Sequence, residues 1–209
     1  MLSRLPFYPT ILERLKTGNE QFLDLGCCLG QDIRKLVADG APSEYLYGSD
    51  IKPEFFDLGY KLFCDKETLK STFIAADIFD TSSNLKSLDD KIDIVYIGAF
   101  LHLFNYEEQA TVCKRLVTLL RAKPGSVIVG SQVGHLKPGE RVHEANKSQK
   151  MWSHNAKSFS EMWDEVGLAT NSKWRVEAVE GSIPMNLNND RGRWHDPDVI
   201  RLIFTVFRE

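Results

Sequence analysis

The chain has little of what marks a secreted, membrane-spanning or metal-binding protein. It has four cysteines in 209 residues, none of them in a Cys-x-x-Cys pair or near a histidine at metal-ligand spacing, so we expect free thiols and no metal site. No hydrophobic run approaches the roughly 20 residues that cross a bilayer. Residues 1–16 also lack the apolar core of a secretory signal. These absences predict a cytoplasmic protein without a membrane partner.

A concentrated positive charge is also missing. The 26 lysines and arginines are spread among 29 acidic residues, and the formal net charge is -3. Proteins that bind nucleic acid through its phosphates need a basic face, so no nucleic-acid partner is expected. The 43% of hydrophobic residues is enough for a sizeable core. We expect one domain over residues 1–209, with a short N-terminal cap at 1–20 and a substrate loop at 134–156.

Short apolar strands alternate with amphipathic helices along the sequence, without repeats or low-complexity linkers. The expected strands lie at residues 21–25, 44–49, 72–75, 92–97, 126–130, 173–179 and 199–207. This alternation predicts an α/β fold with a Rossmann-like, doubly wound sheet of seven strands, mostly parallel. Because the last strand follows another strand directly, we expect it to be antiparallel.

The most informative segment is residues 22–32, where an apolar strand leads into a glycine-bearing turn and then a helix. Ligands of parallel sheets bind at the carboxyl ends of the strands. Gly26 and Gly30 allow a sharp turn there and let a cofactor lie against bare backbone, and the small Cys27 fits in the same turn. Asp50, at the end of the next strand, is placed to accept hydrogen bonds from both hydroxyls of a ribose. The segment therefore predicts a nucleotide site.

Asp24, at the entrance to this turn, indicates which nucleotide binds. A dinucleotide places a diphosphate over the turn, which a carboxylate would repel, and the G-x-G-x-x-G fingerprint is incomplete here. S-adenosylmethionine instead presents an ammonium and a sulfonium, which a nearby acid favours. Asp77 offers an acceptor to the adenine amine, and Ile51 and Ile78 can flank the ring. Each aspartate alone also fits a helix or turn cap, but all of them together predict S-adenosylmethionine as the cofactor.

The methyl acceptor, a small molecule, is expected just beyond the fourth strand. Gly98 and Ala99 are small and leave room beside the sulfonium, and His102 follows where the next element begins. A histidine near neutral pKa can act as the base for a hydroxyl acceptor, whereas a carboxyl acceptor is already ionised and His102 would only orient it. A histidine held in the pocket wall is the alternative.

Further acceptor contacts are expected after the fifth strand. Gln132 lies in a polar turn at 130–135, and the loop at 139–154 contains further candidate side chains. Arg141 could pair with a carboxylate, and Trp152 and His154 could form a wall against a ring system. A solvated loop with Trp152 in a local cluster fits the sequence equally well. Residues 186–198 form a second candidate rim.

Four segments resemble one group of class I S-adenosylmethionine-dependent methyltransferases, and the likeness covers essentially the whole chain. They are Ser3–Pro9, Leu23–Asp32, Ala38–Pro42 and Phe56–Tyr60. The group comprises small fungal methyltransferases of meroterpenoid and related secondary-metabolite clusters. The resemblance implies methyl transfer to a carboxyl or hydroxyl oxygen of a small hydrophobic molecule of polyketide or terpenoid origin. It also implies that Tyr8 lies on the substrate side.

The sequence departs from that group at its start. Such enzymes usually carry a longer N-terminal segment that folds over the site, whereas about twenty residues precede the first strand here. The lid would then come from a partner subunit, as in a homodimer, or the site would be open. The second hypothesis is therefore a cofactor-binding homologue without turnover, or a subunit that needs a partner-supplied lid. Methylation of nucleic acid or protein, and a dehydrogenase, fit fewer of the residues.

Overall fold

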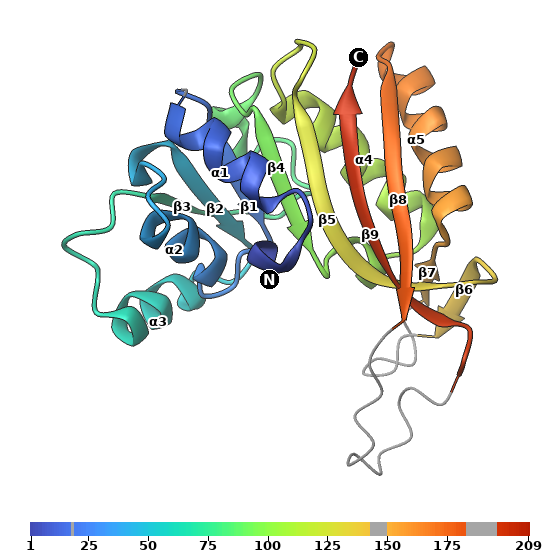
Figure 1. The fold of residues 1–209 in the computed structure, drawn as a ribbon, viewed down its shortest axis with the longest axis horizontal. Coiled ribbons are helices and arrows are strands. Elements are labelled where there is room, and N and C mark those ends of the chain that lie inside the picture. The colour runs from blue at the N-terminus through green and yellow to red at the C-terminus, as the bar shows by residue number, and fades with distance from the viewer. Residues whose placement is uncertain (18, 143–149, 183–195) are drawn as a thin grey trace.

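The computed structural model describes residues 1–17, 19–142, 150–182 and 196–209. Its main element is a seven-stranded sheet in the order β3-β2-β1-β4-β5-β9-β8 (Figure 1). The strands are β1 (Phe22–Leu25), β2 (Leu46–Asp50), β3 (Thr72–Ala75), β4 (Ile94–Gly98), β5 (Val127–His135), β8 (Trp174–Ser182) and β9 (Val199–Arg208). Each of them corresponds to a strand expected from the sequence, so the predicted α/β fold is confirmed.

The sheet is parallel except at β9. β1 pairs in parallel with β2 and β4, β2 with β3, and β4 with β5. β9 lies antiparallel between β5 and β8, which an adjacent strand can do without a crossover connection. The predicted antiparallel last strand is confirmed. The carboxyl ends of β1 to β5 consequently meet at one edge of the sheet.

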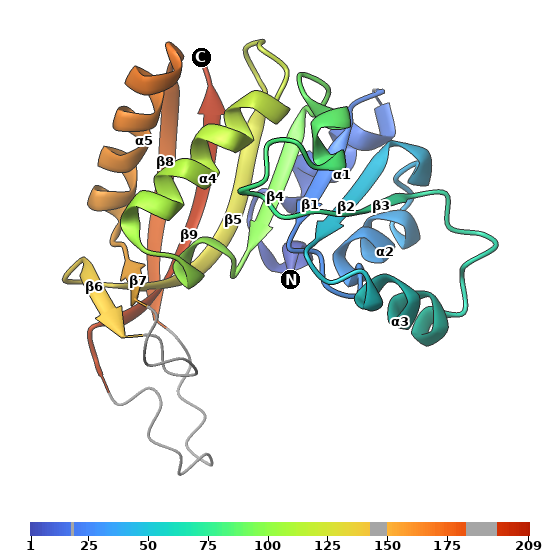
Figure 2. The ribbon, with the colours of Figure 1, turned by 180° about the vertical axis from the view of Figure 1, so that it is seen from behind.

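Helices cover both faces of the sheet. α1 (Tyr8–Thr17) and α2 (Gln31–Ala38) lie on one face, and α4 (Tyr106–Leu119) and α5 (Ala156–Thr170) lie on the other, as the two opposite views show (Figures 1 and 2). α3 (Glu54–Phe63) packs beside β3, where the rings of Phe56 and Tyr60 contact Phe73. None of the described helices has the length and apolar content needed to cross a membrane.

The strands divide the core into two clusters. Phe22 packs with Ile11 and Ile33 on the side of α1 and α2, whereas Leu23 packs with Leu116 on the side of α4. Successive residues of a strand point to opposite faces. Asp24 therefore points to the same side as Phe22, toward the start of α2.

The N-terminal segment is part of this core. Residues 1–20, expected to form a short cap, contain the 3-10 helix η1 (Leu2–Arg4) and α1. Leu2 and Leu15 are buried in the cluster beneath α1. The backbone amide of Leu2 donates a hydrogen bond of 2.7 Å to Oδ1 of Asp32, on α2. This bond fixes the start of the chain beside the carboxyl end of β1.

The described residues within 134–156, the expected substrate loop, include parts of three strands. β5 continues to His135 because β9 pairs with it along its whole length, so residues 130–135 form a strand and not a turn. β6 (Gly139–Val142) and β7 (Lys150–Ser153) then form a two-stranded antiparallel sheet. The backbone amide of Trp152 donates to the Phe104 carbonyl at 2.8 Å, and Nε2 of Gln109 donates to the Trp152 carbonyl at 2.8 Å. These bonds attach β7 to the start of α4.

His154, just before α5, is a buried titratable group. Its side chain is inaccessible to solvent, its Nδ1 lies 2.9 Å from Oγ of Ser158, and its ring packs edge-on against Phe159. Burial lowers the pKa of His154 from 6.5 to about 4, because the imidazolium would lose its hydration. The folded protein therefore takes up this proton only near pH 4, whereas the unfolded chain takes it up near pH 6.5.

The free energy of unfolding should therefore fall as the pH is lowered from about 6.5 to about 4, where only the unfolded state binds the proton. The pKa difference corresponds to about 2 to 3 kcal/mol between pH 7 and pH 4.5. Urea unfolding of the unchanged protein and of His154→Phe at both pH values measures this effect. The variant should lose less stability over the interval, and an equal loss in both proteins would contradict the assignment.

Candidate active site

Two neighbouring cavities lie at the carboxyl ends of the parallel strands. Cavity A, of about 430 Å³, follows β1 to β4 and is lined by Leu25, Gly26, Asp50, Ile51, Ala76, Asp77, Ile78, Phe79, Gly98, Ala99, Phe100, Leu103 and Phe104. Cavity B, of about 510 Å³, lies toward α2 and β9 and is lined by Met1, Asp24, Gly26, Gln31, Asp32, Tyr96, Gly98, Ala99, Ser131, Gln132, Val133 and Arg201. Gly26, Gly98 and Ala99 line both cavities, so the two adjoin at these small residues.

The two carboxylates of cavity A are held in place by backbone amides. Oδ2 of Asp50 accepts from the amide of Cys28 at 2.9 Å, and its Oδ1 accepts from the amide of Lys52 at 3.1 Å. Oδ1 of Asp77 accepts from the amide of Phe79 at 2.9 Å. A carboxylate oxygen can accept more than one hydrogen bond. Both side chains can therefore also bind hydroxyl or amine donors of a ligand.

The rest of the wall of cavity A is apolar. Ile78 is buried, while Ile51 is 59% exposed and faces the open side. The ring of Phe104 packs edge-on against Phe79 and Phe100, with centroid distances of 5.3 Å in both pairs. Apolar walls with a few fixed polar groups are typical of a small-molecule site. Cavity A thus combines apolar walls with two acceptors, which suits an adenosine.

Gly26 has to be glycine for two separate reasons. Its φ is +74°, in the left-handed region that side chains rarely adopt. A Cβ at this position would also lie 2.7 Å from the Phe100 ring. Its amide donates to the Ser49 carbonyl at 2.8 Å, which fixes the turn against the end of β2. The bare backbone at Gly26 leaves the space that joins cavity A to cavity B.

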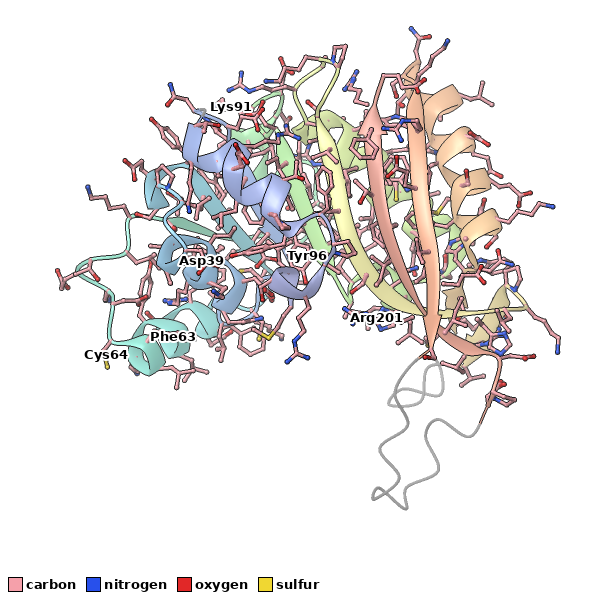
Figure 3. The ribbon with its side chains drawn as sticks, in the orientation of Figure 1. Asp39, Phe63, Cys64, Lys91, Tyr96 and Arg201 are labelled. Carbon is pink, nitrogen blue, oxygen red and sulfur yellow. The ribbon has the colours of Figure 1, made fainter. Side chains whose placement is uncertain are left out.

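Cavity B has acids on one wall and a cation on the other. Asp24 is buried, and burial together with the charge of Asp32 raises its pKa well above the ordinary value. A cationic group placed beside Asp24 would stabilise the carboxylate. On the far wall, Arg201 donates from Nη2 to Oγ of Ser131 at 3.1 Å. Figure 3 shows Arg201 at the end of the sheet where β4 and β5 finish.

Two residues predicted to contact the cofactor, Cys27 and Gly30, lie outside the lining of both cavities. Gly30 has a φ of +69°, and a Cβ there would lie 2.7 Å from the ring of Phe73. Cys27 is buried, and burial raises the pKa of its thiol. Neither residue lines cavity A or cavity B. The described geometry therefore gives Cys27 and Gly30 a packing role in the turn, and direct contact with the cofactor stays a prediction for both.

His102, the predicted catalytic residue, lies in the 3-10 helix η4 (Leu101–Leu103) and is half-buried. Phe100 and Leu103 on either side of it line cavity A, but His102 lines neither cavity. Its role as a base or orienting group therefore stays a prediction.

Of the five predicted acceptor-side residues, the structure brings one to cavity A or cavity B. Gln132 lines cavity B, and the other four lie elsewhere. Tyr8 is the buried first residue of α1, and its hydroxyl donates to Oδ2 of Asp39 at 2.5 Å. Arg141, on β6, donates to the carbonyls of Lys137 and Gly139.

Trp152 and His154 belong to an aromatic cluster with Tyr106, in which the Tyr106 and Trp152 centroids are 5.2 Å apart. This arrangement matches the local cluster that the sequence also allowed for Trp152. The rim expected at residues 186–198 lies outside the described residues except for 196–198.

The sequence analysis did not single out Tyr96 and Arg201 as site residues, although both line cavity B. Tyr96 lies in the apolar run of β4, where a tyrosine passes as a core residue. Arg201 stands in an otherwise apolar strand, Val199–Phe207, and a lone cation in such a strand was a usable signal. Figure 3 labels both residues, Tyr96 on β4 and Arg201 at the edge of cavity B.

Within the described residues, His135, Asp196 and Asp198 lie close enough together to hold a metal ion. Nε2 of His135 lies 3.0 Å from Oδ2 of Asp196, and Nζ of Lys137 lies 2.6 Å from Oδ2 of Asp198. Since these groups already satisfy one another and line neither cavity, no metal role is assigned to them.

Comparison with known proteins identifies the family. Residues 22–123 match the family model described as a methyltransferase domain. The chain is 42% identical to the O-methyltransferase phiE of Fungal sp. (strain ATCC 74256), over 97% of this chain and 71% of phiE. It is 44% identical to the O-methyltransferase atr3 of Stereocaulon alpinum, over 97% of this chain and 58% of atr3.

A solved structure shows the same fold. The S-adenosylmethionine dependent methyltransferase from Mesorhizobium loti has a TM-score of 0.63 at 16% identity, covering 100% of both chains. The chain belongs to the S-adenosylmethionine-dependent methyltransferases, in the family of the fungal O-methyltransferases phiE and atr3. The predicted family and its cofactor, S-adenosylmethionine, are confirmed.

The residues of both cavities fit this cofactor. Asp50 and Asp77 are fixed acceptors in an apolar slot for the adenosine, and Asp24 offers a carboxylate to an ammonium group. Gly26, which has no side chain, lies where cavity A and cavity B adjoin. The cofactor would therefore lie across Gly26, with its adenosine in cavity A and its methionyl part in cavity B.

Asp77 and Asp80 form a matched pair for testing this placement. Each accepts from the backbone amide two residues ahead at 2.9 Å, but only Asp77 lines cavity A. Asp77→Asn should weaken the binding of S-adenosylhomocysteine about tenfold or more, because a charged hydrogen-bond acceptor for the adenine amine is lost. Calorimetric titration measures the dissociation constant. Asp80→Asn should bind as the unchanged protein does, and equal effects of both substitutions would contradict the placement.

Proposed function

We propose that this protein transfers a methyl group from S-adenosylmethionine to an oxygen of a small hydrophobic acceptor derived from polyketide or terpenoid metabolism. The observation that carries the proposal is the junction of the two cavities at Gly26, Gly98 and Ala99. Cavity A suits an adenosine, and cavity B has room beyond the methionyl part. The names of phiE and atr3, both O-methyltransferases, support oxygen as the acceptor atom.

When bound, S-adenosylmethionine would supply an activated methyl group to the acceptor oxygen and would leave as S-adenosylhomocysteine. The protein's own residues contribute position and exclusion of water. Asp50 and Asp77 orient the adenosine, and Asp24 orients the ammonium. Gly98 and Ala99 are small, so the acceptor oxygen can approach from cavity B. Phe100 and Phe104 keep water out of cavity A.

His102 is the candidate base if the acceptor binds as a neutral hydroxyl, and it would only orient a carboxyl acceptor, which is already ionised. Its half-buried position beside Phe100 and Leu103 supports this role. A cytoplasmic location and a homodimer are proposed on the sequence alone.

A second candidate is a cofactor-binding module that another polypeptide segment completes. One observation favours it: of the five predicted acceptor-side residues, Gln132 alone lines cavity A or cavity B. The chain also spans 71% of phiE and 58% of atr3. On this alternative, the described residues hold the cofactor and a partner closes the acceptor side.

Incubation with S-adenosylmethionine carrying a labelled methyl group tests the proposal. The acceptors would be a panel of aromatic and terpenoid carboxylic acids and phenols, with NAD binding as a separate control for the cofactor class. We expect label in at least one acid or phenol and no uptake of NAD. Firm binding of S-adenosylhomocysteine without transfer to any acceptor, alone or as a dimer, would favour the second candidate.

A further inference from the structure

Tyr96 carries its hydroxyl to the junction of the two cavities. Tyr96 and Gly98 are two residues apart on β4, so their side-chain positions lie on the same face of the sheet. A Cβ at Gly98 would collide with the hydroxyl oxygen of Tyr96, and the next-nearest atoms belong to the same ring. The hydroxyl therefore lies over Gly98, which lines both cavity A and cavity B.

The hydroxyl of Tyr96 is free to meet a ligand at this junction. Tyr96 lines cavity B, although only 3% of the residue is exposed. Its hydroxyl has no hydrogen-bond partner among the described residues, and it is not one of the unpartnered polar atoms that are closed to solvent. Because the hydroxyl of a buried tyrosine usually finds a partner, an unpartnered one beside a cavity points to a partner in the ligand.

The surroundings of Tyr96 keep this hydroxyl neutral. Asp24 is the direct neighbour of Tyr96 in the pairing of β1 with β4. Burial and the charges of Asp32 and Asp24 raise the pKa of Tyr96, against an opposing effect of the Arg201 charge. A neutral phenol keeps oxygen lone pairs that can accept hydrogen bonds. The negative charges that raise this pKa also favour a cationic group at the same place.

The junction is also where the sulfonium of the cofactor would lie. In S-adenosylmethionine the sulfur joins the adenosyl part to the methionyl part, and it carries the methyl group. With the adenosine in cavity A and the methionyl part in cavity B, the sulfur falls at the residues that both cavities share, Gly26, Gly98 and Ala99. These three residues have no polar side chain, and the hydroxyl of Tyr96 brings a polar atom to this place.

We propose that the hydroxyl oxygen of Tyr96 contacts the sulfonium methyl group of bound S-adenosylmethionine and so makes the site prefer this cofactor over S-adenosylhomocysteine. The sulfonium charge polarises the methyl C–H bonds, which then donate weak hydrogen bonds to oxygen. S-adenosylhomocysteine has neither the charge nor the methyl group, so the contact exists only before transfer. Tyr96 thus positions the methyl group and favours release of the product. This inference rests on the cofactor placement in the proposed function.

The substitution Tyr96→Phe tests the proposal, because it removes the oxygen and keeps the ring. Calorimetric titration without an acceptor measures the dissociation constants of S-adenosylmethionine and S-adenosylhomocysteine separately. The variant should bind S-adenosylmethionine about fivefold more weakly, as expected for one lost contact of this kind, and S-adenosylhomocysteine within about twofold of the unchanged protein. A tyrosine that only supports the packing of β4 would change both constants alike, so the ratio of the two constants is the deciding measurement.

Tyr47→Phe is the matched control. Tyr47 is a partly buried tyrosine on β2 that packs against the core, and it lines neither cavity A nor cavity B. Loss of its hydroxyl should change neither dissociation constant.

A second measurement uses the unchanged protein and does not depend on how a variant folds. S-adenosylmethionine with an isotope-labelled methyl group is bound, and nuclear Overhauser contacts from this methyl group are recorded. Among the described residues, Tyr96 is the only tyrosine that lines cavity A or cavity B. The methyl group should therefore show a contact with the ring hydrogens of one tyrosine.

Three outcomes would overturn the inference. Tyr96→Phe could leave both dissociation constants unchanged. It could also weaken both equally, which would place the hydroxyl against a part of the cofactor that the product shares. The bound methyl group could show no contact with a tyrosine ring. Failure of the unchanged protein to bind either compound would instead contradict the proposed function.

Discussion

The arrangement of the site depends on the backbone of Gly26. The turn after β1 must take a left-handed conformation, and the Phe100 ring occupies the place where a Cβ would stand. The amides of Gly26 and Cys27 both donate to the Ser49 carbonyl, at 2.8 and 3.0 Å. The turn is thereby fixed to β2, whose last residue, Asp50, lines cavity A. One glycine thus fixes the turn beside the ends of β1 and β2 and leaves the passage between the cavities open.

The two cavities differ in how their polar groups are satisfied. In cavity A, Asp50 and Asp77 are already bonded to backbone amides, so their orientation is fixed before a ligand arrives. In cavity B, Asp24 is buried and its pKa is raised. Its carboxylate is costly without a cationic partner. The adenosine side of the site is therefore preorganised, while Asp24 would gain stabilisation when the ammonium of the cofactor binds.

Sequence patterns predicted the elements whose bounds depend on residues close to them in the chain. The strand Thr72–Ala75 has the bounds expected from the sequence, and a helix begins at Gln31, after the glycine-bearing turn, as expected. The acids at the ends of β1, β2 and β3 were predicted from their positions alone. The length of β5 was not predicted, because its continuation to His135 depends on pairing with β9. The hairpin of β6 and β7 was missed for a similar reason, since it is attached through Gln109 and Phe104. The lone cation in its strand was a signal for Arg201, but its place beside Ser131 depends on the pairing of β9 with β5.

The most direct test of the account is a titration of Gly26→Ala with S-adenosylhomocysteine, using Gly125→Ala as the control. Gly125 also has a positive φ, of +89°, but a Cβ there would meet nothing within 4 Å. Both substitutions carry the same kind of backbone strain, of about 1 kcal/mol. The account predicts that only Gly26→Ala loses affinity, by about tenfold or more. Equal binding by the two variants would contradict the claim that the bare backbone at Gly26 makes the site.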